Sequence, residues 1–234
     1  MEQIAAYCKL CFGGAFNPIH HGHLISARAA AEALGIRSVV LLPYHESPHK
    51  KLHPNAPKEM PDSSGAQSLA EHRLTMCRLA VAGFDKLTAG GFKNPTAGGF
   101  GGFEVDDREL RRPGPTYTID TVRELKQAGW QRVPWLLGAD QVVKLHTWHQ
   151  PQQLLHEAWL VVLERPGIEL DWLKLPPEFR VLAERVVPAP AIDISSTDIR
   201  RRVARGDSID FLTPPAVCEY ISEHGLYRGL HSEG

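Results

Sequence analysis

Residues 11–23 read Cys-Phe-Gly-Gly-Ala-Phe-Asn-Pro-Ile-His-His-Gly-His and connect an apolar run to a segment with helical spacing. The apolar run, Tyr7–Phe12, has the length of a strand, and the helical pattern covers His23–Leu34. The two glycines lack the Cβ atoms that would keep a phosphate away from the main chain, and Pro18 stiffens the turn. The stretch therefore predicts a strand, a backbone cradle for an anion and a helix in immediate succession.

The same alternation continues along the chain. Further apolar runs of strand length are Val39–Leu42, Phe103–Val105, Trp135–Leu137, Leu160–Leu163 and Val186–Val187, and helical spacing recurs over Leu69–Ala82, Tyr117–Gln127 and Thr197–Ala204. Alternating strands and helices predict an α/β fold: a Rossmann-like, doubly wound, mainly parallel sheet with helices on both faces. Ligands of such sheets bind beyond the carboxyl ends of the strands, so the loops that follow strands are the candidate site.

The 234 residues are enough for one domain with a sizeable core, and we expect a single domain over residues 1–234. Its C-terminal part, from about residue 195, is expected to be helical. The polar, proline-containing stretch His53–Ser68 is typical of either a mobile lid or a plain surface loop. At about residues 85–102 the sequence Thr-Ala-Gly-Gly-Phe occurs twice, which indicates a flexible glycine-rich insertion.

Charge is nearly balanced, with 26 basic and 27 acidic side chains and a net charge of -1. No long-range field therefore draws the protein toward nucleic acid or an anionic membrane, and any bound anion must be held by local groups. The sequence has no basic leader and no apolar run of the ~18 to 20 residues that a membrane span needs. We expect a cytoplasmic protein that binds neither nucleic acid nor membrane; no sequence signal indicates an oligomeric state.

Cys8 and Cys11 form a C-x-x-C pair that has two interpretations. Together with His20 and His23 they resemble a Cys2His2 zinc site, but the eight residues between the pairs fall short of the usual spacing of about 12 to 15. The surrounding apolar run favours the alternative, in which both cysteines are small apolar residues of a buried first strand.

His20 and His23 are the first candidates for catalysis. If the helix begins near Gly22, both histidines lie at its N-terminus, where unpaired amides and the positive end of the dipole favour anions. Imidazoles there can donate hydrogen bonds to phosphoryl oxygens and stabilise charge that develops in a transition state. A surface cap would explain one such histidine, but two after a pair of glycines indicate a phosphate site.

A second anion site is predicted near the C-terminus, where residues 192–200 read Ile-Asp-Ile-Ser-Ser-Thr-Asp-Ile-Arg. Ser195 and Asp198 have nearly the spacing of a capping box, and Gly206 suits the end of the helix. Three hydroxyl groups and Arg200 in the first turn could also hold an anion. Neither a G-x-x-x-x-G-K-[ST] nor a G-x-G-x-x-G motif occurs, which argues against a P-loop enzyme or a conventional dinucleotide dehydrogenase.

These motifs carry a family resemblance. Gly13-Gly-x-Phe-x-Pro-x-His-x-Gly-His23 and Ile194-Ser-Ser-Thr-x-x-Arg200 resemble the signature pair of the nucleotidylyltransferase superfamily, whose histidine motif is shared with class I aminoacyl-tRNA synthetases. The motifs between them occur in the order seen in bacterial nicotinate-nucleotide adenylyltransferases: Ser47-Pro-His-Lys50, Gly114-Pro-Thr-Tyr-Thr-Ile-Asp-Thr121, Leu137-Gly-Ala-Asp140, Leu145-x-x-Trp148 and Glu164-Arg-Pro-Gly167. The resemblance spans about residues 8–227.

The resemblance implies transfer of AMP from ATP to nicotinate mononucleotide, with Mg2+ held mainly by the ATP phosphates and no protein metal ligand. Its implied catalytic residues are His20, His23, Lys50 and Arg200. The implied ATP-binding residues are Gly13, Gly14, Ala15, Phe16, Ile194, Ser195, Ser196 and Thr197. The implied acceptor-binding residues are Thr116, Tyr117, Thr118, Gly138, Asp140 near a ribose, Trp148 stacked on the pyridine ring, and Arg165.

Two departures from the family pattern are Ala15, where Thr or Ser is usual, and the insertion at about 85–102. We expect the first to remove one phosphate hydrogen bond, and the second touches no motif. Alternative functions are an adenylyltransferase that prefers nicotinamide mononucleotide or phosphopantetheine, and a non-catalytic nucleotide-sensing or RNA-binding module. Phosphopantetheine enzymes lack the Gly-Pro-x-Tyr-Thr and Leu-x-x-Trp segments, and the balanced charge argues against RNA.

Overall fold

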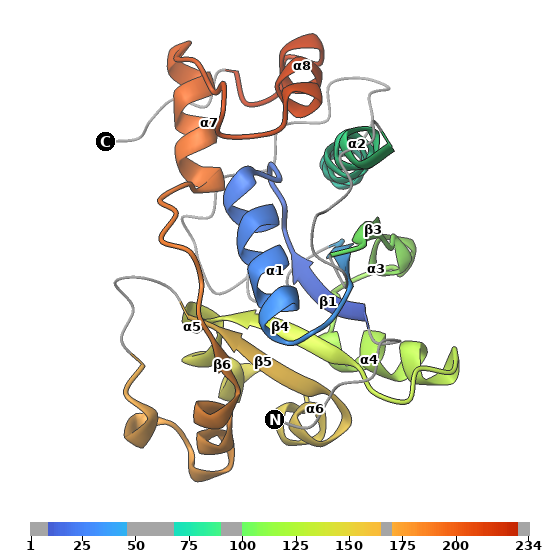
Figure 1. The fold of residues 1–234 in the computed structure, drawn as a ribbon, viewed down its shortest axis with the longest axis vertical. Helices are drawn as coiled ribbons and strands as arrows, with labels where there is room; N and C mark the ends of the chain where they lie inside the picture. Colours follow the sequence, from blue (N-terminus) through green and yellow to red (C-terminus); the bar gives the residue numbers. More distant parts are fainter. Residues whose placement is uncertain (1–8, 46–67, 90–99, 165–169, 229–234) are drawn as a thin grey trace.

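A computed structural model of the chain describes residues 9–45, 68–89, 100–164 and 170–228, and the structural statements that follow concern these residues. They form one sheet of six strands in the order β3-β2-β1-β4-β5-β6, with all neighbouring strands parallel (Figure 1). The strands are β1 (Lys9–Gly14), β2 (Ser38–Pro43), β3 (Gly102–Val105), β4 (Pro134–Gly138), β5 (Trp159–Leu163) and β6 (Val186–Val187). The expected doubly wound parallel sheet is confirmed.

Helices connect the strands and cover both faces of the sheet. The α-helices are α1 (His21–Ala33), α2 (Leu69–Ala89), α3 (Arg108–Arg111), α4 (Thr118–Gln127), α5 (Ala139–Val142), α6 (Pro151–Glu157), α7 (Ser196–Arg205) and α8 (Pro215–Glu223). Short 3-10 helices are η2 (Leu145–Thr147), η3 (Trp172–Lys174) and η4 (Pro177–Arg185). In the described part of the chain, no helix is both long and apolar enough to cross a membrane.

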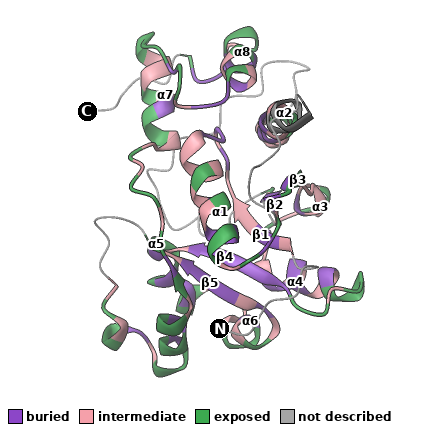
Figure 2. Cartoon of the chain, viewed as in Figure 1, coloured by how far each residue is buried: buried purple, intermediate pink, exposed green. Residues whose placement is uncertain are grey.

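The sheet separates two apolar cores because successive strand residues point to opposite faces. In β4, Leu136 packs in the core beneath α1, α2 and α8, whereas Trp135 and Leu137 pack in the core beneath α4 and α6. Neighbouring strands are buried on both faces, as Figure 2 shows for β4 and β5. This double burial explains why the strands read as continuous apolar runs rather than as alternating polar and apolar residues.

The boundaries of the four predicted helices differ from those observed by at most two residues, except at the end of α2. The sequence predicts an end at Ala82, before Gly83, but α2 continues to Ala89, so residues 85–89 of the expected flexible insertion are helical. A single glycine in a helix costs only about 1 kcal/mol, which the flanking helix formers can offset. At the other end of the insertion, Phe100 is buried against Phe103, at a ring distance of 5.0 Å. Residues 90–99, and the proposed lid up to residue 67, lie outside the described residues.

The strand order places a topological switch point at β1, whose neighbours are β2 on one side and β4 on the other. The chain runs outward from β1 through β2 to β3, then returns to start the second half at β4. The loops that follow β1 and β4 therefore diverge to opposite sides of the sheet and leave a crevice between them. The end of β1 and the loop after it carry the glycine and histidine motif, and the end of β4 and the start of α5 carry Gly138 and Asp140; residues of both segments border this crevice.

Candidate active site

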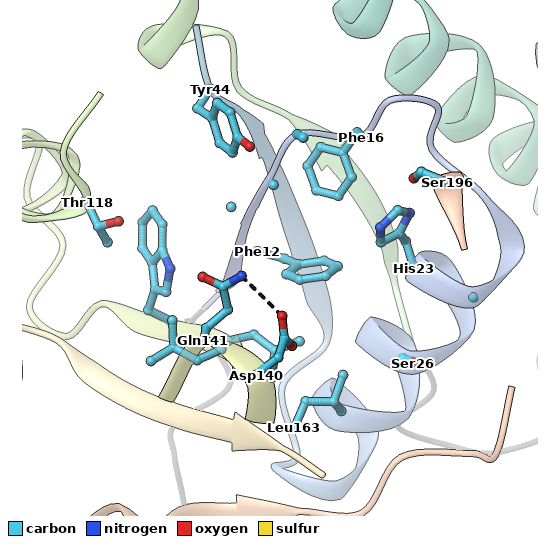
Figure 3. Close-up of a pocket in the computed structure, with 18 of the residues that line it drawn as sticks. Phe12, Phe16, His23, Ser26, Tyr44, Thr118, Asp140, Gln141, Leu163 and Ser196 are labelled. Carbon is cyan, nitrogen blue, oxygen red and sulfur yellow. Dashed lines mark hydrogen bonds between the residues drawn. The ribbon is translucent and has the colours of Figure 1, made fainter. Parts of the chain in front are cut away.

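A cavity of about 590 Å³ lies at the carboxyl ends of β1, β4 and β5. Its walls come from both halves of the sheet: Figure 3 shows Thr118 on one side, His23 and Ser196 on the other, and Phe12 between them. Fifteen of the residues expected from the sequence line it: Gly13, Gly14, Ala15, Phe16, His20, His23, Thr116, Tyr117, Thr118, Gly138, Asp140, Trp148, Ile194, Ser195 and Ser196. The fold thus brings together motifs that lie as far apart in the chain as Gly13 and Ser196.

The loop after β1, residues 15–20, is here called the cradle loop. Side chains from distant parts of the chain donate hydrogen bonds to its carbonyl groups. Arg200 Nη1 donates to Asn17 O at 2.7 Å, Ser196 Oγ donates to Pro18 O at 2.9 Å, and Thr213 Oγ1 donates to Ile19 O at 2.7 Å. Tyr227 Oη also donates to the Asn17 side-chain oxygen at 2.6 Å. These bonds fix a loop that would otherwise have no regular hydrogen-bond partners.

Gly13 and Gly14 have a packing role besides leaving the main chain open to a phosphate. A Cβ atom on Gly13 would lie 2.8 Å from Trp135 Cζ2, and one on Gly14 would lie 2.9 Å from Phe16 Cζ. Phe16 itself has a positive φ of 47°, which is uncommon for a residue with a side chain. The glycines therefore make room for two aromatic rings that shape the cavity wall.

His20 and His23 lie at the start of α1, as the sequence predicts, although the helix begins at His21. His20 is the N-cap: its Nδ1 accepts the amide of His23 at 3.3 Å. Because Nδ1 is an acceptor, the neutral imidazole carries its proton on Nε2. The two rings stack with centroids 3.6 Å apart, and His23 meets the edge of Phe16 at 5.2 Å. Aromatic packing therefore fixes the orientation of both imidazoles at the cavity wall.

The start of α7 lies beside the cradle loop in the same wall, with Ser196 near His23 (Figure 3). Ser195 is its N-cap and accepts the amide of Asp198 at 3.0 Å, and Gly206 ends the helix with a φ of 78°, so both expected caps are present. Helix geometry leaves the amides of Ser196 and Thr197 without partners inside α7. The Ser196 hydroxyl, by contrast, already donates to Pro18 O. An anion at the start of α7 would therefore be bound mainly by the backbone amides of the helix, and less by its hydroxyl groups.

The family resemblance implies that Arg200 and Thr197 contact phosphate, but their side chains lie outside the cavity lining. Arg200 Nη2 donates to Thr197 Oγ1 at 3.2 Å, while Nη1 holds the cradle loop. Burial lowers the pKa of Arg200 from its ordinary value, but the group stays cationic at neutral pH. The arginine therefore lies behind the cradle loop, where it holds the loop and adds positive charge.

The acceptor end of the cavity is built on the start of α4. Thr116 is 8% exposed, and its hydroxyl oxygen has no hydrogen-bond partner among the described residues. Tyr117 is the N-cap of α4 and stacks on His149 at a ring distance of 4.3 Å. The side chain of Tyr117 makes no capping hydrogen bond to the first amides of α4. Trp148 lines the cavity nearby, so an aromatic surface and unused hydrogen-bonding groups face the same space.

A buried carboxyl group supports this end of the cavity. Glu109 is 3% exposed, lines the cavity and accepts a 2.6 Å hydrogen bond from Thr121 Oγ1 in the first turn of α4. Arg112 donates to the same hydroxyl and lies 4.0 Å from the carboxylate. Burial raises the pKa of Glu109 to about 7, although Thr121 and Arg112 favour the ionised form. This network connects the residues on either side of the Gly-Pro-Thr-Tyr-Thr segment.

Two expected site residues, Lys50 and Arg165, lie outside the described residues, as does Cys8 of the zinc alternative. Cys11 is fully buried in the core beneath α4 and α6, while His23 contacts Phe16 of the other core. Burial raises the pKa of the Cys11 thiol far above its ordinary range, so it does not supply a thiolate. Among the described residues, no three His, Cys, Asp or Glu side chains are close enough together to hold a metal ion.

Sequence reasoning missed several cavity-lining residues, including Tyr44, Glu109, Gln141, Lys144, His149 and Glu164. Tyr44 and Glu164 directly follow β2 and β5, so their position after a strand was the signal that could have found them. Glu109 had no such signal, because only the packing of α3 against α4 brings its carboxyl group into the wall.

Comparisons with known proteins agree with this arrangement. The family model described as cytidylyltransferase-like matches residues 11–202. A Thermomicrobium roseum protein named probable nicotinate-nucleotide adenylyltransferase is 39% identical, covering 94% of this chain and 92% of the relative. A Yersinia pestis protein of the same name is 37% identical, covering 93% and 94%. The solved Plasmodium falciparum nicotinic acid mononucleotide adenylyltransferase complexed with NaAD has a TM-score of 0.61 at 17% identity, covering 94% of this chain and 98% of that one, which shows a shared fold.

Proposed function

Because the chain belongs to the cytidylyltransferase-like family and, within it, to the nicotinate-nucleotide adenylyltransferases, we propose that it transfers the adenylyl group of ATP to nicotinate mononucleotide. The products are deamido-NAD and pyrophosphate. One observation carries this proposal: a single cavity joins the cradle loop, both histidines and the start of α7 to the start of α4 and Trp148. Phosphate-binding groups thus face an aromatic acceptor site across the switch point of the sheet.

The reaction needs positioning and charge stabilisation rather than a protein nucleophile. A phosphate oxygen of the acceptor attacks the α-phosphorus of ATP, and the bond from that phosphorus to the oxygen bridging to the β-phosphate breaks. Pyrophosphate then leaves with the electron pair of the broken bond. Such transfers are accelerated mainly by alignment of the reactants and by groups that neutralise phosphoryl charge.

The ATP side of the cavity supplies these groups. The backbone of Gly13, Gly14, Ala15 and Phe16 would line the adenylate phosphates, and His20 and His23 would donate to phosphoryl oxygens. Ile194, Ser195, Ser196 and Thr197 would receive the pyrophosphate end on the first amides of α7, where the helix dipole favours negative charge. Arg200 would act from behind the cradle loop that it holds. Lys50 would add a positive charge.

The acceptor side would hold nicotinate mononucleotide between Trp148 and the start of α4. Trp148 would stack on the pyridine ring, and the amides of Thr116, Tyr117 and Thr118 would meet its carboxylate. Gly138 and Asp140 lie at the end of β4, where they would contact the ribose. Arg165 would add a positive charge near the acceptor phosphate.

Mg2+ is proposed to enter with ATP. The described groups at the phosphate end of the cavity are amides, imidazoles and hydroxyls, which suit phosphate oxygens. Among the described residues, the cavity carboxylates Glu109, Asp140 and Glu164 form no three-ligand cluster. This donor set fits an ion that keeps several waters and is otherwise bound mostly by oxygens of the substrate phosphates. When bound, the ion would neutralise charge on the triphosphate.

The direct test is release of pyrophosphate from MgATP by the purified protein, with nicotinate mononucleotide as acceptor and product identified as deamido-NAD. Parallel reactions with nicotinamide mononucleotide and with phosphopantetheine separate the alternative acceptors. A nucleotide sensor would bind ATP but release no pyrophosphate with any of the three. Absence of deamido-NAD under conditions in which ATP binds would overturn the proposed function.

A further inference from the structure

Arg73 of α2 lies behind the cavity wall and connects two of the loops that form it. The side chain is 5% exposed and is not part of the cavity lining. Its Nη1 donates to Ala15 O at 2.7 Å, and its Nη2 donates to Tyr44 O at 2.8 Å and His45 O at 3.2 Å. One guanidinium group thus binds the cradle loop after β1 and the segment after β2.

These two segments separate where Arg73 binds them. β1 and β2 pair in parallel up to Gly14 and Pro43, and the amide of Tyr44 still reaches Gly14 O at 3.3 Å. Beyond this point, the segments that follow β1 and β2 are no longer paired as strands of the sheet. Arg73 joins them instead, and its guanidinium also lies 5.7 Å from the centre of the Tyr44 ring. Ala15 and Tyr44 both line the cavity, so the arginine fixes two parts of its wall.

The bond to Ala15 also sets the direction of a backbone amide. The Ala15–Phe16 peptide is trans, and in a trans peptide the carbonyl and the N–H point in opposite directions. Since Ala15 O points to Arg73, outside the cavity, the N–H of Phe16 points away from Arg73, toward the side where Ala15 and Phe16 line the cavity. An N–H in that direction is a donor for a phosphate.

The same bond stabilises an uncommon backbone conformation. Phe16 has a φ of 47°, a conformation that is unfavourable for a residue with a side chain unless its surroundings hold it. Arg73 holds the carbonyl of Ala15 before it, and Arg200 holds the carbonyl of Asn17 after it. The conformation of Phe16 is therefore determined by one arginine on each side.

We propose that Arg73 is a positioning residue for ATP: it orients the Ala15–Phe16 peptide so that the cradle loop presents an amide to the triphosphate. This inference rests on the proposed function only in placing ATP at the cradle loop. Lysine cannot replace the arginine fully, because its single ammonium lacks the planar fork that reaches the carbonyls of both loops at once.

The test compares Arg73→Met and Arg73→Lys with Arg78→Met as a matched control. Arg78 lies on the same helix, is 58% exposed and pairs with Asp107 at 3.1 Å. For Arg73→Met we expect kcat/KM for ATP to fall on the order of 10²-fold, because a small displacement of aligned groups has effects of that size. Arg73→Lys should lie between Arg73→Met and wild type, KM for the acceptor should change little, and Arg78→Met should match wild type.

Binding of a non-hydrolysable ATP analogue, measured by calorimetry, tests the same point without the acceptor. Both Arg73 variants should bind it more weakly than wild type at an unchanged far-ultraviolet circular dichroism spectrum. Equal losses toward ATP and acceptor would assign Arg73 a purely structural role, and wild-type affinity for the analogue would also overturn the proposal. If Arg73→Met does not fold, Arg73→Lys decides between these outcomes. Failure of wild type to make deamido-NAD would overturn the proposed function but leave the binding comparison valid.

Discussion

At the scale of single residues, the two histidines are set up by their neighbours before any substrate arrives. His20 accepts the amide of His23, the two imidazole rings stack on each other, and His23 packs edge-to-face with Phe16. A donor held in this way needs no reorganisation when charge develops on a phosphate. His20 can cap the helix and donate to a phosphate at the same time. Its Nδ1 accepts the amide of His23, and its proton stays on Nε2, where it can be donated.

We expect His20→Ala and His23→Ala each to lower kcat by about 10²- to 10³-fold, the usual effect of losing one preorganised donor. The measurement is steady-state pyrophosphate release, with thermal unfolding as a control for folding. His20→Asn is a useful second variant because asparagine also caps helices. It should keep the stability of wild type and still lose activity. Near wild-type turnover in either alanine variant would show that the histidine in question is not catalytic.

At the scale of elements, the start of α4 should determine the choice of acceptor. The side chain of Tyr117 does not cap its first amides, and Thr116 Oγ1 is buried without a partner among the described residues. A carboxylate on the pyridine ring would accept hydrogen bonds from these donors, whereas an amide substrate would turn its NH2 group toward them. A buried group left unpaired costs about 1 to 3 kcal/mol, and a charge-assisted bond would also be lost.

We therefore expect kcat/KM for nicotinate mononucleotide to exceed that for nicotinamide mononucleotide by at least about 10²-fold. Trp148→Ala should weaken the binding of both acceptors, because stacking does not distinguish their rings, and should preserve the order of preference. Equal kcat/KM values for the two mononucleotides, or a preference for the amide, would contradict the acceptor assignment without affecting adenylyl transfer.

The glycine-rich segment gives a second prediction at this scale. Deleting residues 90–99, with a short linker in their place, should leave catalysis within a few-fold of wild type, since closure entropy changes slowly with loop length. Deleting residues 88–102 should instead destabilise the protein. That deletion removes buried Phe100 and Gly101, whose amide bonds to Arg37 O at 2.5 Å. Thermal unfolding and pyrophosphate release are measured for both deletion variants. Equal thermal stability of the two variants would contradict the prediction.

At the scale of the whole molecule, Glu109 should make stability depend on pH. Burial raises the pKa of Glu109 to about 7, with opposing effects from Thr121 and Arg112 and smaller raising effects from Asp106 and Glu124. An unfolded glutamate ionises near its ordinary value of 4.5. Between these two values the unfolded chain releases a proton that the folded protein keeps. The free energy of unfolding therefore falls as pH rises from about 4.5 to 7 and is constant for this group above that range.

Glu109→Gln removes this contribution while keeping an oxygen that accepts from Thr121. The difference in free energy of unfolding, variant minus wild type, should increase by about 3 kcal/mol from pH 4.5 to pH 7.5. His21 and His72 have pKa values lowered by burial and give the opposite trend, but they are present in both proteins and cancel in the difference. Urea denaturation at several pH values measures it. A difference independent of pH would show that Glu109 titrates normally.

The sequence by itself determined the order of the six strands and of the helices α1, α2, α4 and α7, and the chemistry of the main motifs, whereas the short helices α3, α5 and α6 were not predicted. Strands buried on both faces read as unbroken apolar runs, and helix starts show caps such as Ser195 within a few residues of chain. Both signals are local, so they can be recognised without coordinates. The same holds for residues 13–23, where glycines, a proline and histidines lie close together in the sequence.

Only the tertiary structure decided what holds these motifs in place. It gave Gly13 a packing role against Trp135, placed Arg200 behind the cradle loop, and brought Glu109 and Arg73 to the site. Each of these depends on contacts between residues that lie far apart in the chain. Hydrogen bonds and steric contacts act over a few ångströms in space, and sequence distance does not report which residues the crossovers of the sheet bring within that range.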